Sequence, residues 1–125
     1  MEQIETYGAL LGRLLIVVIF FLNATGVVDQ ARPAREMAEF GVPPALIPPA
    51  MLVGRSLQLL GGLAVLTGFY PQLGALALIA FLVPATVIAH HFWDRTGAER
   101  QIQLANFLKN LAMIGGLVLV AARWS

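Results

Sequence analysis

The sequence contains no cysteine and only two histidines among its 125 residues. Without thiols, the chain itself forms no disulfide, no zinc–thiolate site and no cysteine-ligated iron–sulfur cluster. Two histidines are too few for most metal sites that are built from protein ligands alone. Any redox role therefore requires a bound organic cofactor or another subunit.

Charged residues are also scarce. Asp, Glu, Lys and Arg make up 12% of the chain, about half of the roughly 25% that is typical of soluble domains. The formal net charge is only +1, so the basic excess of a nucleic-acid-binding protein is missing and we expect no nucleic-acid partner. In contrast, 58% of the residues are hydrophobic, which is more apolar surface than a soluble domain of this length can cover.

The hydrophobic residues gather in four long runs. Each run has about 20 residues, enough for a helix to cross a bilayer core about 30 Å thick. The runs cover residues 8–28, 46–69, 73–92 and 104–122. The sequence therefore predicts an all-α membrane protein, with one domain over residues 1–125 that forms a four-transmembrane-helix bundle. The acidic start of the chain, with Glu2 and Glu5, differs from a signal peptide and favours a retained first span.

The connections between the runs differ in length. Residues 70–72 allow only a tight turn, so the second and third spans should form an antiparallel hairpin. The first connection, residues 29–45, contains a predicted short interfacial helix over residues 33–40. Pro33 suits a first helical turn and Gly41 a helix end. A plain surface loop is the alternative. The third connection, residues 93–103, is polar.

Basic residues suggest an orientation for the bundle. Four spans place both termini on one side and the first and third connections on the other. Those two connections hold Arg32, Arg35, Arg95 and Arg100, whereas the terminal side holds Arg13 and Arg123. The positive-inside rule then predicts cytoplasmic connections and non-cytoplasmic termini.

Polar residues inside the spans are the candidate functional residues, because an ionisable side chain at the bilayer centre costs about 2.5–3.5 kcal/mol on insertion scales. Helical spacing and span direction place them in the half of the membrane that faces the first and third connections. We predict that they face the bundle interior and form a polar pocket that binds a cofactor. The residues are Arg55, Gln58, His90, Asn106, Lys109 and Asn110.

Two other interpretations of these residues remain open. The asparagines could simply hydrogen-bond neighbouring helices, and Lys109 could extend to the membrane surface. The adjacent His90 and His91 point about 100° apart on a helix, so they cannot grip one metal ion from one face. We therefore predict no metal site. We also predict no catalytic residue.

Several short motifs together resemble the DoxX family over nearly the whole chain. They are Gly12-Arg13-Leu14-Leu15, Glu39-Phe40-Gly41-Val42-Pro43, Leu59-Leu60-Gly61-Gly62-Leu63-Ala64, His90-His91-Phe92-Trp93, and Phe107-Leu108-Lys109-Asn110-Leu111-Ala112 followed by Gly115-Gly116-Leu117. The resemblance implies a four-helix bundle in a bacterial inner (cytoplasmic) membrane. It also implies association with redox systems, since named members are subunits of a thiosulfate:quinone oxidoreductase or assemble with soluble redox enzymes.

The chain departs from the family pattern at two places. Gln58 stands where members often have Glu before the Gly-Gly pair, and no basic residue lies within 26–29 at the end of the first span. An acid–base role at Gln58 therefore lacks its titratable group.

Three functions follow from these observations. The first is an accessory subunit of a membrane redox complex, which binds quinone or lipid and does no redox chemistry alone. The second is a structural subunit that only packs against other membrane subunits. The third is a homo-oligomeric binder or transporter of small anions, with Arg55 and Lys109 as the anion site. In each case the expected partners are membrane lipids and other protein chains, and no covalent cofactor is expected.

Overall fold

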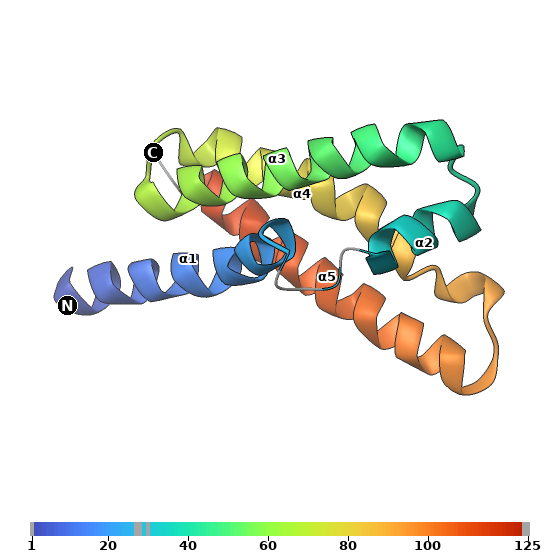
Figure 1. Cartoon of the computed structure of the whole chain (residues 1–125). Coiled ribbons are helices and arrows are strands. Elements are labelled where there is room, and N and C mark those ends of the chain that lie inside the picture. The colour runs from blue at the N-terminus through green and yellow to red at the C-terminus, as the bar shows by residue number, and fades with distance from the viewer. Residues whose placement is uncertain (1, 27–28, 30, 124–125) are drawn as a thin grey trace.

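The computed structural model describes residues 2–26, 29 and 31–123 (Figure 1). These form α1 (Glu2–Ala24), α2 (Ala31–Phe40), α3 (Ile47–Thr67), α4 (Pro71–Ala89) and α5 (Gly97–Arg123), with short 3₁₀ turns η1 (Pro44–Leu46) and η2 (Phe92–Asp94). No strand occurs among the described residues. Helices α1, α3, α4 and α5 are long and apolar enough to cross a membrane. The predicted all-α architecture, with four spans and a short helix between the first two, is confirmed.

The helices do not begin and end where the apolar runs do. Helix α1 begins at Glu2 instead of residue 8 and ends at Ala24, shortly before Gly26 with its positive φ of 85°. The predicted end at Val28 lies outside the described residues. Helix α5 begins at Gly97 instead of residue 104. Hydropathy marks only the apolar part of a span, whereas helical hydrogen bonds are local and continue through polar turns.

The segment between the first two spans is helical, as predicted, and does not form a plain loop. Helix α2 ends at Phe40, and the next residue, Gly41, has a φ of 110° that only glycine adopts readily. The N–H groups of Gly41 and Val42 both donate to the carbonyl oxygen of Met37, at 3.2 and 3.0 Å. These bonds satisfy a carbonyl at the helix end and turn the chain toward α3.

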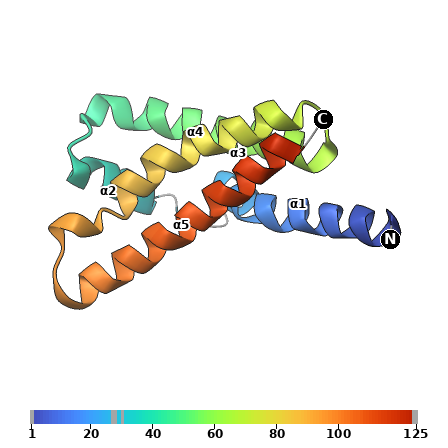
Figure 2. The ribbon, with the colours of Figure 1, turned by 180° about the vertical axis from the view of Figure 1, so that it is seen from behind.

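Helices α3 and α4 form an antiparallel hairpin that is the centre of the fold (Figures 1 and 2). The two backbones approach closely where Gly61 of α3 meets Gly74 of α4. A Cβ atom at Gly74 would lie 2.7 Å from the carbonyl oxygen of Gly61 and 2.6 Å from Ala64 Cβ. Small residues thus set the helix spacing here, as they commonly do between membrane helices.

Each of the other two spans packs against a different helix of this hairpin. Helix α1 packs against α3, and α5 crosses along α4, while α1 and α5 meet only over a short stretch. The fully enclosed core lies where these helices converge. It consists of Val17, Phe20, Val65, Ala75, Leu78, Leu82 and Leu117. Most other apolar side chains point outward, as expected for a surface that faces lipid tails.

The arrangement of the helices and connections predicts an orientation of the bundle in the membrane, which can be tested. Helix α2, turn η2 and the start of α5 lie at one end of the bundle, and the start of α1 and the end of α5 lie at the other (Figure 1). Because the arginine-rich connections share one end, a reporter fused after the C-terminal Ser125, a residue outside the described ones, should read as non-cytoplasmic. The measurement is a paired phosphatase and fluorescent-protein fusion. A cytoplasmic reading would reverse the topology without changing the helix packing.

Candidate binding site

A cavity of about 200 Å³ lies between α1, α4 and α5, and we call it the inner cavity. Its wall is mostly apolar and aromatic, and the rings of Phe20 and Phe81 meet edge to face with 6.3 Å between their centroids. The lining residues are Ile19, Phe20, Asn23, Phe81, Leu82, Ala85, Ala89, His90, Asn110 and Met113. Ile19 of α1 is both a lining residue and 38% exposed on the outer surface.

Two of the polar groups of the inner cavity are fixed by hydrogen bonds to neighbouring elements. Asn110 Nδ2 of α5 donates to Thr86 Oγ1 of α4 at 3.0 Å. Thr86 is buried, and its hydroxyl donates in turn to the carbonyl oxygen of Leu82 at 2.6 Å. His90 Nδ1 lies 2.8 Å from Gln103 Oε1 of α5. Both contacts join α4 to α5, so the polar groups hold these helices together beside the cavity.

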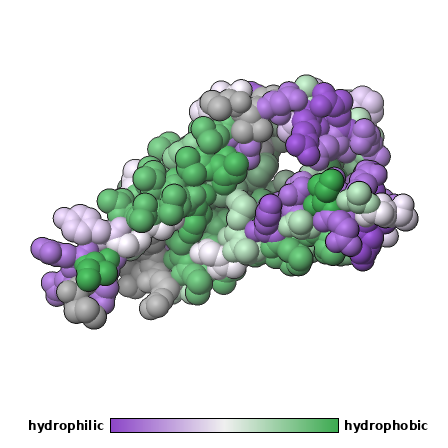
Figure 3. Space-filling model, turned by 90° about the horizontal axis from the view of Figure 1, so that it is seen from below, coloured by the Kyte–Doolittle hydropathy of each residue, from purple (hydrophilic) through white to green (hydrophobic). Residues whose placement is uncertain are grey.

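A second cavity, of about 250 Å³, lies between α2, the end of α4 and the start of α5, and we call it the outer cavity. Figure 3 shows hydrophilic side chains on both sides of a hollow at this end of the bundle, beyond the apolar body of the helices. The lining residues are Arg32, Arg35, Glu36, Glu39, Ile88, Ala89, His91, Arg95, Glu99 and Gln103. Ala89 lines both cavities, and the His90–Gln103 hydrogen bond connects one residue of each.

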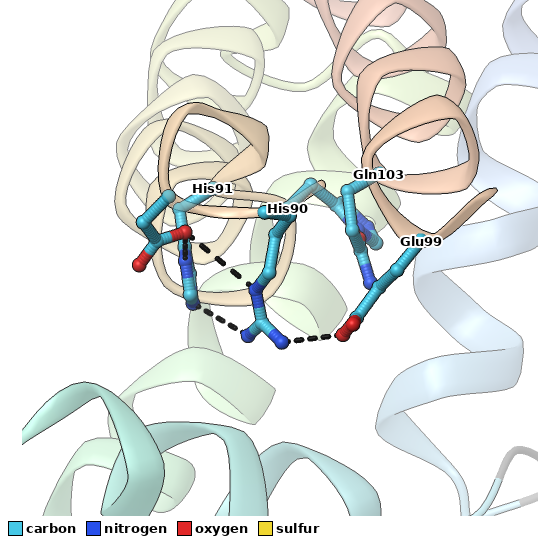
Figure 4. Close-up of polar contacts among 6 residues, drawn as sticks. His90, His91, Glu99 and Gln103 are labelled. Atoms are coloured by element: carbon cyan, nitrogen blue, oxygen red, sulfur yellow. Dashed lines mark hydrogen bonds and ion pairs between the residues drawn. The ribbon is translucent and has the colours of Figure 1, made fainter. Parts of the chain in front are cut away.

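A network of hydrogen bonds and ion pairs stabilises the loop between α4 and α5 (Figure 4). His91, which is buried, lies 2.7 Å from Asp94 Oδ1 through Nδ1 and 3.3 Å from Arg95 through Nε2. Arg95 also pairs with Glu99 of α5. The hydrogen bond from His91 lowers the pKa of Asp94, which lies in the turn η2 after α4. The network fixes the conformation of the loop that carries His90.

Two of the six predicted site residues line the inner cavity. His90 and Asn110 line the inner cavity, whereas Arg55, Gln58, Asn106 and Lys109 line neither cavity. Asn110 turns inward but Lys109 is exposed, so the expected interior-facing stripe on α5 is corrected at Lys109. The two side chains lie on opposite edges of that stripe, about 100° apart, and the packing of α5 on α4 selects the Asn110 edge.

Gln58 and Arg55 lie on α3, away from both cavities. Gln58 is 4% exposed, and its Nε2 donates to the carbonyl oxygen of Gly54 at 3.2 Å. Its Oε1 has no hydrogen-bond partner among the described residues. Arg55 is half-buried. The binding role predicted for both residues stays a prediction.

Two residues at the site were not among the predicted ones. Thr86 lies one helical turn before His90, and this spacing could have identified it from the sequence. Its hydroxyl positions Asn110. Gln103 was assigned to the polar third connection, although it lies within α5. In the part of the chain that the structure describes, no group of three or more His, Asp or Glu side chains could hold a metal ion.

Four spanning helices around a small, mostly apolar interior define a multi-pass integral membrane protein. The DoxX family model matches residues 8–91, and the chain belongs to this family. Among curated proteins, it is 26% identical over 113 residues to the Inner membrane protein YphA of Escherichia coli, covering 90% of this chain and 79% of YphA.

A second relative supports the same location. The Inner membrane protein YqjF of Escherichia coli is 29% identical over 122 residues, which cover 97% of this chain and 87% of YqjF. No solved structure matches the chain. The protein is therefore a multi-pass inner membrane protein.

Proposed function

We propose that this protein is an accessory membrane subunit of a redox system and that it holds a quinone-type molecule in the inner cavity. The observation that supports this most strongly is the composition of that cavity. Ligand pockets typically combine apolar walls with a few polar groups that orient the ligand. Here the aromatic rings of Phe20 and Phe81 stand beside the polar groups of His90 and Asn110.

The size of the cavity fits the head group of such a molecule. Its volume of about 200 Å³ is below the roughly 300–1,000 Å³ of pockets for drug-sized ligands. A single substituted ring therefore fits, and an isoprenoid tail would leave past Ile19 into the lipid. The electrons would come from a partner, because a chain without cysteine cannot ligate an iron–sulfur cluster by thiolates.

The exposed Lys109 supports a partner subunit. Helix α5 has the smallest buried share of the four spans, and Lys109 lies on its outer surface about 8 Å inside the apolar run that begins at Leu104. Charged residues at such depth usually pair with another protein group or extend to the membrane surface. A membrane partner with a carboxylate or backbone carbonyl at this depth would satisfy Lys109.

We expect Lys109→Met to reduce co-purification of native partner subunits several-fold. The substitution keeps most of the side-chain volume but removes the charge that a partner would satisfy. The measurement is quantitative mass spectrometry of complexes captured from native membranes. Arg32→Met is the control, because Arg32 is exposed and its ion pair with Glu36 on α2 is worth at most about 1 kcal/mol. Equal recovery with both variants would contradict the partner role of α5.

A second experiment tests whether the inner cavity holds a quinone. Protein extracted in its native lipid by an amphipathic polymer should retain quinone in a stoichiometric amount after repeated washing, as measured by chromatography of the extracted lipids. A quinone-to-lipid ratio no higher than that of the surrounding membrane would overturn the proposal. The alternative anion site has less support, because neither Arg55 nor Lys109 lines the inner or the outer cavity.

A further inference from the structure

The orientation of the Asn110 amide follows from the hydrogen bonds around Thr86. A threonine hydroxyl has one proton, and Thr86 donates it to the carbonyl oxygen of Leu82 at 2.6 Å. Toward Asn110, the hydroxyl can then only accept, so the group 3.0 Å away must be the amide nitrogen of Asn110. One N–H of Asn110 is thereby used, and its Oδ1 accepts no hydrogen bond from the described residues.

The state of His90 follows in the same way. Gln103 Oε1 can only accept, so His90 Nδ1, 2.8 Å away, carries the proton that it donates. This orientation of Gln103 leaves its N–H groups for the outer cavity, which Glu36, Glu39 and Glu99 line. In a neutral imidazole the other nitrogen is then an acceptor. A neutral His90 therefore offers the ligand a lone pair at Nε2.

The inner cavity thus offers two acceptors whose direction the hydrogen bonds fix, beside the amide of Asn23. His90 contributes the acceptor Nε2, and Asn110 contributes the acceptor Oδ1 together with one remaining N–H. A hydroxyl group can donate to one acceptor while it accepts from the N–H. A carbonyl group can only accept, and it would leave His90 Nε2 desolvated without a partner, which is costly.

We propose that the inner cavity selects the hydroxyl form of its ligand, a quinol, over the carbonyl form, a quinone. This inference rests on the proposed function, because it names which redox state of a quinone-type molecule the site holds. In this assignment His90 and Asn110 present hydrogen-bond acceptors to the ligand. The protein then stabilises the reduced form next to a partner that exchanges electrons with it.

The test compares matched probes on the full chain in lipid nanodiscs under anaerobic conditions. Decylubiquinol should be retained about tenfold more tightly than decylubiquinone, the effect of one to two hydrogen bonds. The redox-inert pair 4-decylphenol and 4-decylanisole should show the same order, because only the phenol carries a donor. Equal retention within each pair, or tighter binding of the carbonyl and ether forms, would overturn the preference. If no probe is retained, the proposed function fails together with the preference.

Two variants test the hydrogen-bond argument directly. Thr86→Val removes the acceptor that holds Asn110 Nδ2, so a second N–H becomes available and the quinol-to-quinone affinity ratio should fall several-fold. Gln103→Met releases His90 from its single tautomer and should have a similar effect. An unchanged ratio in both variants would contradict the assignment.

The matched control is Thr67→Val. Thr67 donates to the carbonyl oxygen of Leu63 at 2.6 Å, as Thr86 does to Leu82, but it lies at the exposed end of α3. Its substitution should leave the affinity ratio unchanged. Helical content measured by circular dichroism shows whether each variant folds. If Thr86→Val does not fold, the quinol-to-quinone affinity ratio of Gln103→Met tests the hydrogen-bond argument by itself.

Discussion

Replacement of Gly74 with alanine should destabilise the protein by about 1–3 kcal/mol, the usual cost of forcing extra volume into a packed interface. The added Cβ atom would lie 2.6 Å from Ala64 Cβ, 2.7 Å from the carbonyl oxygen of Gly61 and 3.2 Å from the backbone nitrogen of Val65. Two of these three atoms belong to the backbone of α3, so no side chain can rotate away. The helices α3 and α4 would have to separate, and the core that they enclose would open.

The measurement is unfolding in mixed micelles of increasing denaturing detergent, followed by circular dichroism. Gly115→Ala is the matched control, because Gly115 also lies within a spanning helix but its added Cβ atom would meet nothing within 4 Å. That substitution should be neutral or stabilising by up to about 1 kcal/mol through helix propensity. Similar losses of stability in both variants would show that the α3–α4 contact does not set the stability.

The number and type of the helices could be predicted because lipid imposes a simple condition on the chain. A spanning segment must be apolar over about 20 residues and must satisfy its own backbone hydrogen bonds. Each of the four runs meets this condition, so helices follow. The same reasoning fails at helix ends, because nothing in lipid solvation stops a helix where polar residues begin. Helix α5 therefore starts at Gly97, and its polar first turns bring Gln103 to His90.

The candidate site could be predicted only in part. Helical spacing shows that Asn106, Lys109 and Asn110 share one broad face, but not which edge of that face turns inward. That choice depends on how α5 packs against α4, where Thr86 receives Asn110 and leaves Lys109 exposed. The polarity of Gln58 suggested a place in the pocket, yet Gln58 is buried on α3 and lines neither cavity.

The sequence alone could not show whether His90 and Asn110 donate or accept hydrogen bonds toward a ligand. A list of residue types shows that His90 and Asn110 can donate hydrogen bonds. Only the contacts of His90 to Gln103 and of Asn110 to Thr86 show that the Nδ1 proton of His90 and one amide proton of Asn110 are already used inside the protein. Contacts between α4 and α5 therefore determine the chemistry that the cavity offers to a ligand.

Replacement of Asn110 with leucine should lower the retention of decylubiquinol by about tenfold. Leucine keeps the approximate volume of asparagine but removes both the Oδ1 acceptor and the remaining N–H from the inner cavity. The loss of one to two hydrogen bonds to the ligand accounts for a change of this size. Thr86 keeps its bond to the carbonyl oxygen of Leu82, so α4 need not rearrange. The measurement is equilibrium retention in nanodiscs, quantified by chromatography.

Asn106→Leu is the control that separates binding from general polarity. Asn106 lies one helical turn before Asn110 on α5 and is also half-buried, but it lines neither cavity. The same chemical change at this position should alter retention by less than about twofold, since no contact to the ligand is lost. If both leucine variants lose retention equally, the effect comes from the membrane insertion of α5. If neither does, the inner cavity does not hold the head group. Loss at Asn110 alone places the ligand between α1, α4 and α5, where the polar groups of α4 and α5 meet.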